Sequence, residues 1–428
     1  MKNGETIYYS CGTPTLAMLK FRISLLKYLF RKNKYPLFTI SARQGGLVKT
    51  YQIQKKLKMS KYVKFNDHIY FSLTMPRWPS EPFDRMVARG GLNIASAGTP
   101  YKKQIDTAIL GITGRCRYGC VHCYEHFNLN DYDVVPVEKW KEVIKDLQKI
   151  GVSVITFSGG EPMMRYDELI ELLETSNHSL SDFHLHTSGY GVTAENAREL
   201  KAAGLIAAGI GLDDVNTDRN DLFRGYNGAH SQAIEAIKYF REAGVFTYVN
   251  FCPTKEIINS GEILKFHEML KDMNVGIIRW LEPRPCGAFL DADENIILNQ
   301  EEKEFLKNLY INLNTLPEYR DYPLISYEAF SEAPENMGCM MGGNSLLYID
   351  SRGNVEPCVF LPVTFGNILF EDFPIIFERM RKAIPKPLKT PCPSIQLRTA
   401  IKNRKDIGSK MPIQYNEIVT EIANLYSA

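Results

Sequence analysis

The chain has 428 residues, 44% of them hydrophobic and 23% charged, which is ordinary for a globular protein and enough for about two or three domains. It contains no apolar run long enough to span a bilayer, and its first ten residues lack a signal-peptide pattern. Nine cysteines in such a chain favour metal ligation over a disulfide framework, so we expect a cytoplasmic protein.

The formal net charge of +2 conceals a basic N-terminal region. Residues 6–66 contain thirteen Lys or Arg and no Asp or Glu, which leaves 38 basic and 49 acidic residues elsewhere. Such a region favours an anionic partner, which could be membrane lipid, nucleic acid or an acidic part of a substrate. The structural alternative is a solvated basic face, or one that docks on the acidic remainder of the same chain.

The first predicted element is an amphipathic helix. Apolar residues recur at steps of three and four over residues 16–30, and Pro14 stands where a helix can start. Basic residues on another face make peripheral contact with an anionic membrane a hypothesis, beside ordinary packing of the apolar stripe into a core.

Two further elements complete the N-terminal extension, residues 1–104. Residues 61–73 alternate about Asn66-Asp67 and predict a β-hairpin. Pro76, Pro79 and Pro82 then predict an extended linker that leads into the next domain.

From residue 105 onward, strand and helix patterns alternate, which predicts a parallel sheet. The predicted strands are 107–112, 152–158, 183–187, 205–212, 246–252 and 276–281. The predicted helices are 136–150, 166–177, 193–203, 231–243 and 261–273. Six such units are fewer than a complete eight-stranded barrel requires.

Three cysteines follow the first of these strands. Cys116, Cys120 and Cys123 have the spacing C-x3-C-x2-C. Three thiolates can hold three corners of a [4Fe–4S] cluster and leave one iron open to bind a small molecule. The main alternative is structural zinc, with His122 or His126 as the fourth ligand.

A Gly-Gly-Glu-Pro sequence follows the second strand. Gly159 and Gly160 let the backbone approach a ligand closely, and Glu161 stands at a strand end, where α/β sheets usually bind ligands.

The cysteine triplet, followed one βα unit later by Gly159–Pro162, resembles the radical S-adenosylmethionine (radical SAM) enzymes. Ile210–Asp213 and Phe223–Gly225 continue the resemblance, which covers about residues 106–290. It implies an α/β fold, with a partial (β/α)6 TIM-like barrel in residues 105–310. It also implies that the three cysteines hold a [4Fe–4S] cluster whose open iron binds SAM. Reductive cleavage of SAM then gives a 5′-deoxyadenosyl radical, which abstracts hydrogen from a substrate C–H bond.

The same resemblance implies roles for individual residues. The SAM-binding residues would be Gly159, Gly160, Glu161, Thr187, Ser188, Asp213 and Arg224. Asp213 could instead cap a helix, because the loop after it is rich in capping residues. His122 replaces the usual aromatic residue before the third cysteine and can still stack on adenine. The candidates to face substrate are Asn250, Arg279, Glu282 and Arg284.

The C-terminal region, residues 311–428, contains Cys339, Cys358 and Cys392. Two predicted strands, 346–349 and 354–359, form a hairpin with Gly353 at the turn. The pattern resembles the SPASM and twitch auxiliary-cluster domains, followed here by C-terminal helices. It implies one auxiliary [4Fe–4S] cluster, because the later C-x2-C-x5-C-x3-C run of SPASM is absent.

The fourth ligand of that cluster stays open between Cys286, a side chain other than cysteine, and the substrate. The alternative is that these are ordinary buried cysteines. Cys11 and Cys252 are interpreted as unligated.

The predicted function is therefore radical SAM chemistry of the oxidoreductase or C–H functionalising type, on a peptide or protein. A lipid, a sugar or another small molecule is the alternative substrate, and flavodoxin or ferredoxin is the expected kind of electron donor. The remote alternative is a non-enzymatic metal- and nucleic-acid-binding protein. We expect no nucleic acid as partner, because Gly159–Pro162 and the βα alternation would have no purpose there.

Overall fold

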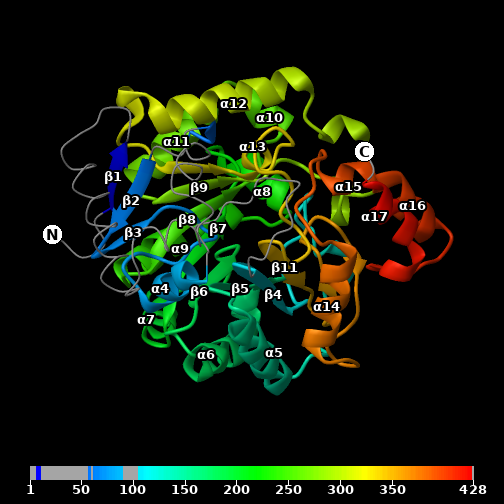
Figure 1. The fold of residues 1–428 in the computed structure, drawn as a ribbon. Helices are drawn as coiled ribbons and strands as arrows, with labels where there is room; N and C mark the ends of the chain where they lie inside the picture. The colour runs from blue at the N-terminus through cyan, green and yellow to red at the C-terminus, as the bar shows by residue number, and fades with distance from the viewer. Residues whose placement is uncertain (1–5, 11–55, 59–60, 90–104, 427–428) are drawn as a thin grey trace, which may run out of the picture.

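The computed structural model describes residues 6–10, 56–58, 61–89 and 105–426, which Figure 1 shows in colour. The amphipathic helix predicted over residues 16–30, and Cys11, lie outside the described residues. In the part of the chain that the structure describes, no helix combines the length and the apolar character needed to cross a membrane.

The central sheet contains the six predicted strands side by side in chain order, all parallel (Figure 1). They are β4 Thr107–Thr113, β5 Val154–Gly159, β6 Asp182–Thr187, β7 Leu205–Gly211, β8 Phe246–Phe251 and β9 Ile277–Trp280. Runs of buried apolar residues fill these strands, as expected for a parallel sheet that is covered on both faces.

Two further parallel strands flank these six. β10 (Leu324–Tyr327) pairs with β9, and β11 (Leu346–Ile349) pairs with β4. β12 (Val355–Glu356) completes the predicted C-terminal hairpin, antiparallel to β11, with Gly353 at φ 88° in the turn. The described sheet thus has eight parallel strands, where the sequence predicted six. β10 follows a helix that the sequence did not predict, Gln300–Thr315, and has only four residues. Residues 346–349 were predicted as a strand of the hairpin, without the pairing to β4.

Helices follow the predicted pattern. The five predicted ones are α5 Val137–Ile150, α6 Tyr166–Thr175, α7 Ala194–Ala202, α9 Ala229–Glu242 and α11 Ile263–Asp272. The unpredicted helices are α8 Thr217–Arg224, α10 Lys255–Asn259, α12 Gln300–Thr315 and α13 Glu328–Ser331. The C-terminal elements are α14 Phe373–Ala383, α15 Pro393–Gln396, α16 Arg398–Asp406, α17 Val419–Asn424 and the short strands β13 Val363–Thr364 and β14 Ile413–Gln414.

The two faces of the sheet have different partners, because successive side chains on a strand point to opposite faces. Ala208, Val249 and Ile278 belong to the core that the sheet shares with its helices. The preceding residues on the same strands belong to a second cluster, which also holds side chains of the N-terminal region. The members of that cluster from the sheet are Ile206, Ala207, Phe246, Tyr248, Ile277 and Leu324.

The N-terminal region packs on this second face. β1 (Thr6–Ser10), β2 (Lys61–Phe65) and β3 (His68–Tyr70) form an antiparallel sheet, which confirms the predicted hairpin. The ring of Tyr70 stacks on Phe246 at 3.8 Å. The ammonium of Lys61 donates hydrogen bonds of 3.1, 2.8 and 2.6 Å to three backbone carbonyls near the end of α12, those of Leu313, Tyr319 and Tyr322.

The predicted proline-rich linker is extended only in part, because helix α4 begins at Glu81 and ends at Ala88. The hydroxyl of Ser80 caps this helix and accepts a hydrogen bond of 3.2 Å from the amide of Phe83. Phe83 and Met86 are buried against Trp78. The segment therefore packs on the fold, and its prolines stand before and inside the first turn of a helix.

Candidate functional site

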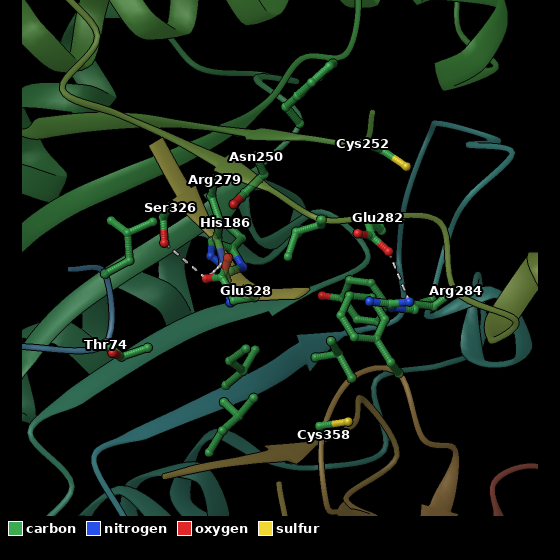
Figure 2. A pocket seen from close by; sticks show the side chains of 18 of the residues that line it. Thr74, His186, Asn250, Cys252, Arg279, Glu282, Arg284, Ser326, Glu328 and Cys358 are labelled. Carbon is green, nitrogen blue, oxygen red and sulfur yellow. Dashed lines mark hydrogen bonds and ion pairs between the residues drawn. The ribbon is translucent and has the colours of Figure 1, made fainter. Parts of the chain in front are cut away.

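A cavity of about 390 Å³ lies on the face of the sheet that carries the N-terminal sheet and extends to the loops after the carboxyl ends of the strands. This volume is in the range of small-molecule sites, about 300–1,000 Å³. Residues from all three regions of the chain line it, and Figure 2 shows one side of its wall. Leu73, Thr74 and Met75 also line the cavity, a position that the sequence did not predict.

The predicted cysteine triplet lies on the loop after β4. Cys116, Cys120 and Cys123 are free thiols, partly buried, and all three line the cavity. The loop is held by short-range contacts: the amide of Tyr118 donates to Cys116 Sγ at 3.4 Å, and the amide of Cys123 donates to the carbonyl of Cys120 at 3.2 Å. Burial raises the pKa of Cys116 to about 12 and also raises the pKa values of the other two thiols.

The two glycines after β5 let that strand end pack against the cysteine loop. Gly159 has φ 122°, and a Cβ atom there would lie 2.3 Å from the carbonyl oxygen of Thr113. A Cβ atom on Gly160 would lie 2.3 Å from the carbonyl oxygen of Arg115. Both glycines line the cavity. Their backbones thus approach the loop itself, a close contact that the sequence interpretation had assigned to a ligand.

The carboxylate of Glu161 is buried and fully engaged by its neighbours. It accepts four hydrogen bonds, from the amide of Met163, the hydroxyl of Thr187, and the amide and hydroxyl of Ser188. Three predicted site residues therefore meet at one point. Thr187 and Ser188 line the cavity, and Glu161 lies behind them and fixes their positions. Burial raises the pKa of Glu161, while these hydrogen bonds act in the opposite direction.

Asp213 and Arg224 form a buried ion pair at the end of β7. The Nε atom of Arg224 donates to Asp213 Oδ2 at 2.6 Å, and the amide of Cys252 donates to the other carboxylate oxygen at 2.8 Å. Both side chains line the cavity. Burial opposes the charge of Arg224, but Asp213 and the Cys120 thiolate raise its pKa. Arg224, which the resemblance assigns to SAM binding, is thus already paired with Asp213, another residue of the same predicted set.

His122 stacks on Phe223, with ring centroids 4.5 Å apart and planes 4° from parallel. Burial lowers its pKa to about 4, so the ring is neutral. The imidazole therefore has an aromatic partner inside the protein.

Four cysteines from distant parts of the chain line the same cavity: Cys286, Cys339, Cys358 and Cys392. Burial raises the pKa of Cys286, and the charges of Cys358 and Cys392 raise it further. Burial and then the charge of Cys392 raise the pKa of Cys358. These thiols are thus within electrostatic reach of one another. Cys252 also lines the cavity, but it stands beside the Asp213–Arg224 pair.

Among the residues that the structure describes, no three His, Cys, Asp or Glu side chains converge closely enough to hold a single metal ion. A cuboidal cluster binds each cysteine at a different iron atom, so its ligands need not converge on one point.

The four candidates to face substrate all line the cavity. Arg284 pairs with Glu282 at 3.2 Å, and Arg279 pairs with Glu328 at 2.8 Å (Figure 2). The sequence missed Glu328, His186 and Ser326, which belong to the same wall. His186 directly precedes Thr187 and Ser188 in the sequence, and this position next to two predicted site residues could have identified it as a candidate. Ser326 lies on β10 and Glu328 begins α13, two elements that the sequence did not predict.

Comparison with known proteins shows a similarity to one family. Residues 110–270 match the model of the Radical SAM superfamily. The AdoMet-dependent heme synthase of Nitratidesulfovibrio vulgaris is 26% identical over 291 residues, which cover 63% of this chain and 77% of that protein. The PqqA peptide cyclase of Bradyrhizobium diazoefficiens is 29% identical over 263 residues, which cover 58% of this chain and 65% of that protein.

The fold is also similar to that of a solved structure, Streptococcus suis SuiB bound to its precursor peptide SuiA. The TM-score is 0.54 at 16% sequence identity, and the alignment covers 70% of this chain and 74% of SuiB. At this identity the likeness concerns the fold alone. Residues 110–270 are therefore similar to the Radical SAM superfamily, and the chain is an enzyme.

Proposed function

We propose that this enzyme cleaves S-adenosylmethionine reductively and removes a hydrogen atom from a C–H bond of a peptide or protein substrate, assisted by an auxiliary iron–sulfur cluster. The observation that carries the proposal is the single cavity that the cysteine loop, the Gly159-Gly160 turn and the C-terminal cysteines all border.

The residues present fit the first cluster. Three thiols stand on one loop at the cavity wall, and the cationic Arg224 beside Cys120 lowers the pKa of that thiol against the effect of burial. Iron binding would convert the thiols to thiolates, because metal ligation requires the deprotonated form. With both groups bound, the cluster and SAM supply a 5′-deoxyadenosyl radical able to abstract hydrogen from an unactivated carbon.

The protein's own residues would orient SAM. The backbones of Gly159 and Gly160, with Thr187 and Ser188, form the cavity wall beside the cysteine loop. Glu161 would act as a positioning residue, because its carboxylate is engaged by Thr187 and Ser188. Arg224 has one N–H committed to Asp213, so its other N–H groups could bind the carboxylate of SAM.

Cys339, Cys358 and Cys392 would hold the auxiliary cluster, with Cys286 as the favoured fourth ligand. Two observations support this ligand. Cys286 lines the same cavity, where the charges of Cys358 and Cys392 raise its pKa as they raise that of Cys339, and its exposed fraction is only 4%. These buried thiols would hold a cluster that supplies one-electron redox chemistry, and their burial and hydrogen bonding would set its potential.

A peptide or protein substrate is supported by the relatives, one a PqqA peptide cyclase, and by the fold likeness to a peptide-bound SuiB. The second candidate is the same chemistry on a small molecule, because another relative is a heme synthase.

The test is formation of 5′-deoxyadenosine by the full chain after anaerobic reconstitution, in the presence of SAM and dithionite. Cys120→Ala should give no product, whereas Cys252→Ala, which changes a cysteine of the same cavity outside both groups, should retain it. The absence of product from well-loaded wild-type protein would refute the proposal.

A further inference from the structure

We infer that Asn250, Arg279 and Glu328 form a subsite that binds an uncharged carboxamide of the substrate, such as a peptide bond. This inference rests on the proposed function and names the chemical group that the cavity recognises. The subsite is part of the wall in Figure 2, where His186, Asn250, Arg279 and Glu328 lie together.

Strand register brings these residues side by side. Asn250 on β8 is paired with Arg279 on β9, and Arg279 is paired with Ser326 on β10. Since the three strands are parallel, the three side chains form one polar row at the cavity end of the sheet. The row two residues earlier on these strands is Tyr248, Ile277 and Leu324, which pack on the N-terminal sheet. Along each strand, therefore, an apolar row is followed two residues later by a polar row.

The polar row has hydrogen-bonding capacity that the protein itself leaves unused. Arg279 donates a hydrogen bond from Nε to Glu328 Oε1 at 2.8 Å. The Arg279 side chain lines the cavity. Glu328 Oε2 and Asn250 Oδ1 are buried and have no hydrogen-bond partner. Because buried polar atoms are nearly always paired in folded proteins, these two acceptors indicate a ligand that donates hydrogen bonds.

Charge excludes a simple anion as that ligand. Arg279 is neutralised by Glu328, and the neighbouring Arg284 is neutralised by Glu282. Glu332 adds a further carboxyl group, whose pKa is raised to about 7 by burial and then by Glu328. A carboxylate ligand would meet Arg279 but leave Glu328 Oε2 and Asn250 Oδ1 unpaired. An ammonium ligand would satisfy these acceptors but face the guanidinium.

A carboxamide can pair with both the hydrogen-bond acceptors and the guanidinium donor of this row. Its N–H can donate to Glu328 or Asn250, and its oxygen can accept from Arg279, with no net charge added to the cavity. His186 beside the row stays neutral, because burial and the charge of Arg279 lower its pKa. The arrangement therefore matches a group that has a donor and an acceptor next to each other.

The experiment measures binding of three small probes to the full chain without reductant, by ligand-observed saturation-transfer NMR. The probes are N-acetylglycine N-methylamide, propionate and propylammonium. The diamide should bind the wild-type protein most tightly. Tighter binding of propionate or propylammonium, or no detectable binding of the diamide, would overturn the inference. Because no SAM cleavage is required, this result is independent of the 5′-deoxyadenosine assay.

Two variants locate the binding. Asn250→Leu should weaken diamide binding about fivefold, the effect of one lost hydrogen bond, and leave propionate binding unchanged. Glu328→Gln keeps the size of the side chain but leaves Arg279 uncompensated, so the preference should shift towards propionate by about tenfold. Glu304→Gln makes the same change at an exposed ion pair with Lys307 and serves as the control. Unchanged probe preferences in both cavity variants, with thermal unfolding like the wild type, would refute the subsite.

Discussion

The two cysteine groups of this enzyme reach one cavity by different routes. Cys116, Cys120 and Cys123 lie within eight residues on a single loop, and contacts inside that loop set its shape. Cys339, Cys358 and Cys392 are spread over 54 residues. They are brought to the cavity by long-range contacts, above all the pairing of β11 with β4.

Local sequence determines the geometry of the first cysteine group, whereas tertiary contacts determine that of the second. The geometry of the first group depends on its own sequence and on one neighbouring turn, Gly159-Gly160. The second group depends on docking of the whole C-terminal segment, in which Cys339 pairs with Leu388 by two backbone hydrogen bonds of 2.8 and 3.0 Å. Disturbing one group should therefore leave the other in place.

The sharpest contrast is catalytic. Cys120→Ala should reduce 5′-deoxyadenosine formation by more than about 1,000-fold, because a cluster with two protein ligands is not retained. Cys358→Ala should keep the formation of 5′-deoxyadenosine within about tenfold of the wild type while it lowers iron content. Equal loss of activity in both variants, at equal fold stability, would contradict the independence of the two groups.

The turn that supports the first group gives the second prediction. Gly160→Ala places a Cβ atom 2.3 Å from the carbonyl oxygen of Arg115 and should lower the free energy of unfolding by about 3 kcal/mol. Gly119→Ala, in the cysteine loop itself, brings its Cβ no closer than 3.8 Å to the carbonyl oxygen of Gly225 and should cost less than about 0.5 kcal/mol. Urea denaturation of the two variants compares them, and a similar cost for both would argue against the close contact.

The docking of the second group has a buried amide at its centre. Asn344 Nδ2 donates to the carbonyl of Met341 at 2.9 Å, and Asn344 Oδ1 accepts from Arg381 at 2.7 Å. Asn344→Leu removes these bonds and a longer one, of 3.5 Å, from Nδ2 to the carbonyl of Ile384, and we expect a loss of about 2 kcal/mol in the free energy of unfolding. Iron bound by the C-terminal cysteines should fall, and 5′-deoxyadenosine formation should not. Unchanged stability would show that the segment docks without this amide.

The smallest expected effect concerns Glu161. Ser188→Ala removes one hydroxyl donor to its carboxylate, and the Ser188 amide remains as a donor at 2.7 Å. A loss of about 1 kcal/mol in the free energy of unfolding should accompany a several-fold rise in the KM for SAM. A change in kcat at constant KM would be evidence against a positioning role.

The sequence predicted what local patterns encode. The six strands β4–β9 and the cysteine loop were recognisable because buried runs and ligand spacing are local features. Tertiary placement was not recognisable. Strand β10 and helix α13 have only four residues each, too few for a recognisable pattern, so Ser326 and Glu328 were missed while Asn250 and Arg279 were found. Strand β11 was predicted, but its pairing with β4 was not. Likewise, the partner of Arg224 is Asp213, a pairing across a helix that composition does not reveal.

The most direct test of the proposed two-cluster site is an iron count with Mössbauer spectroscopy on anaerobically reconstituted protein. The wild type should bind about eight iron atoms per chain, as two [4Fe–4S] clusters. A variant with Cys116, Cys120 and Cys123 all replaced by Ala should keep about four, in one cluster with a diamagnetic [4Fe–4S]2+ spectrum. Folded variant protein with almost no iron would contradict the account, because the C-terminal cysteines would then hold no cluster of their own.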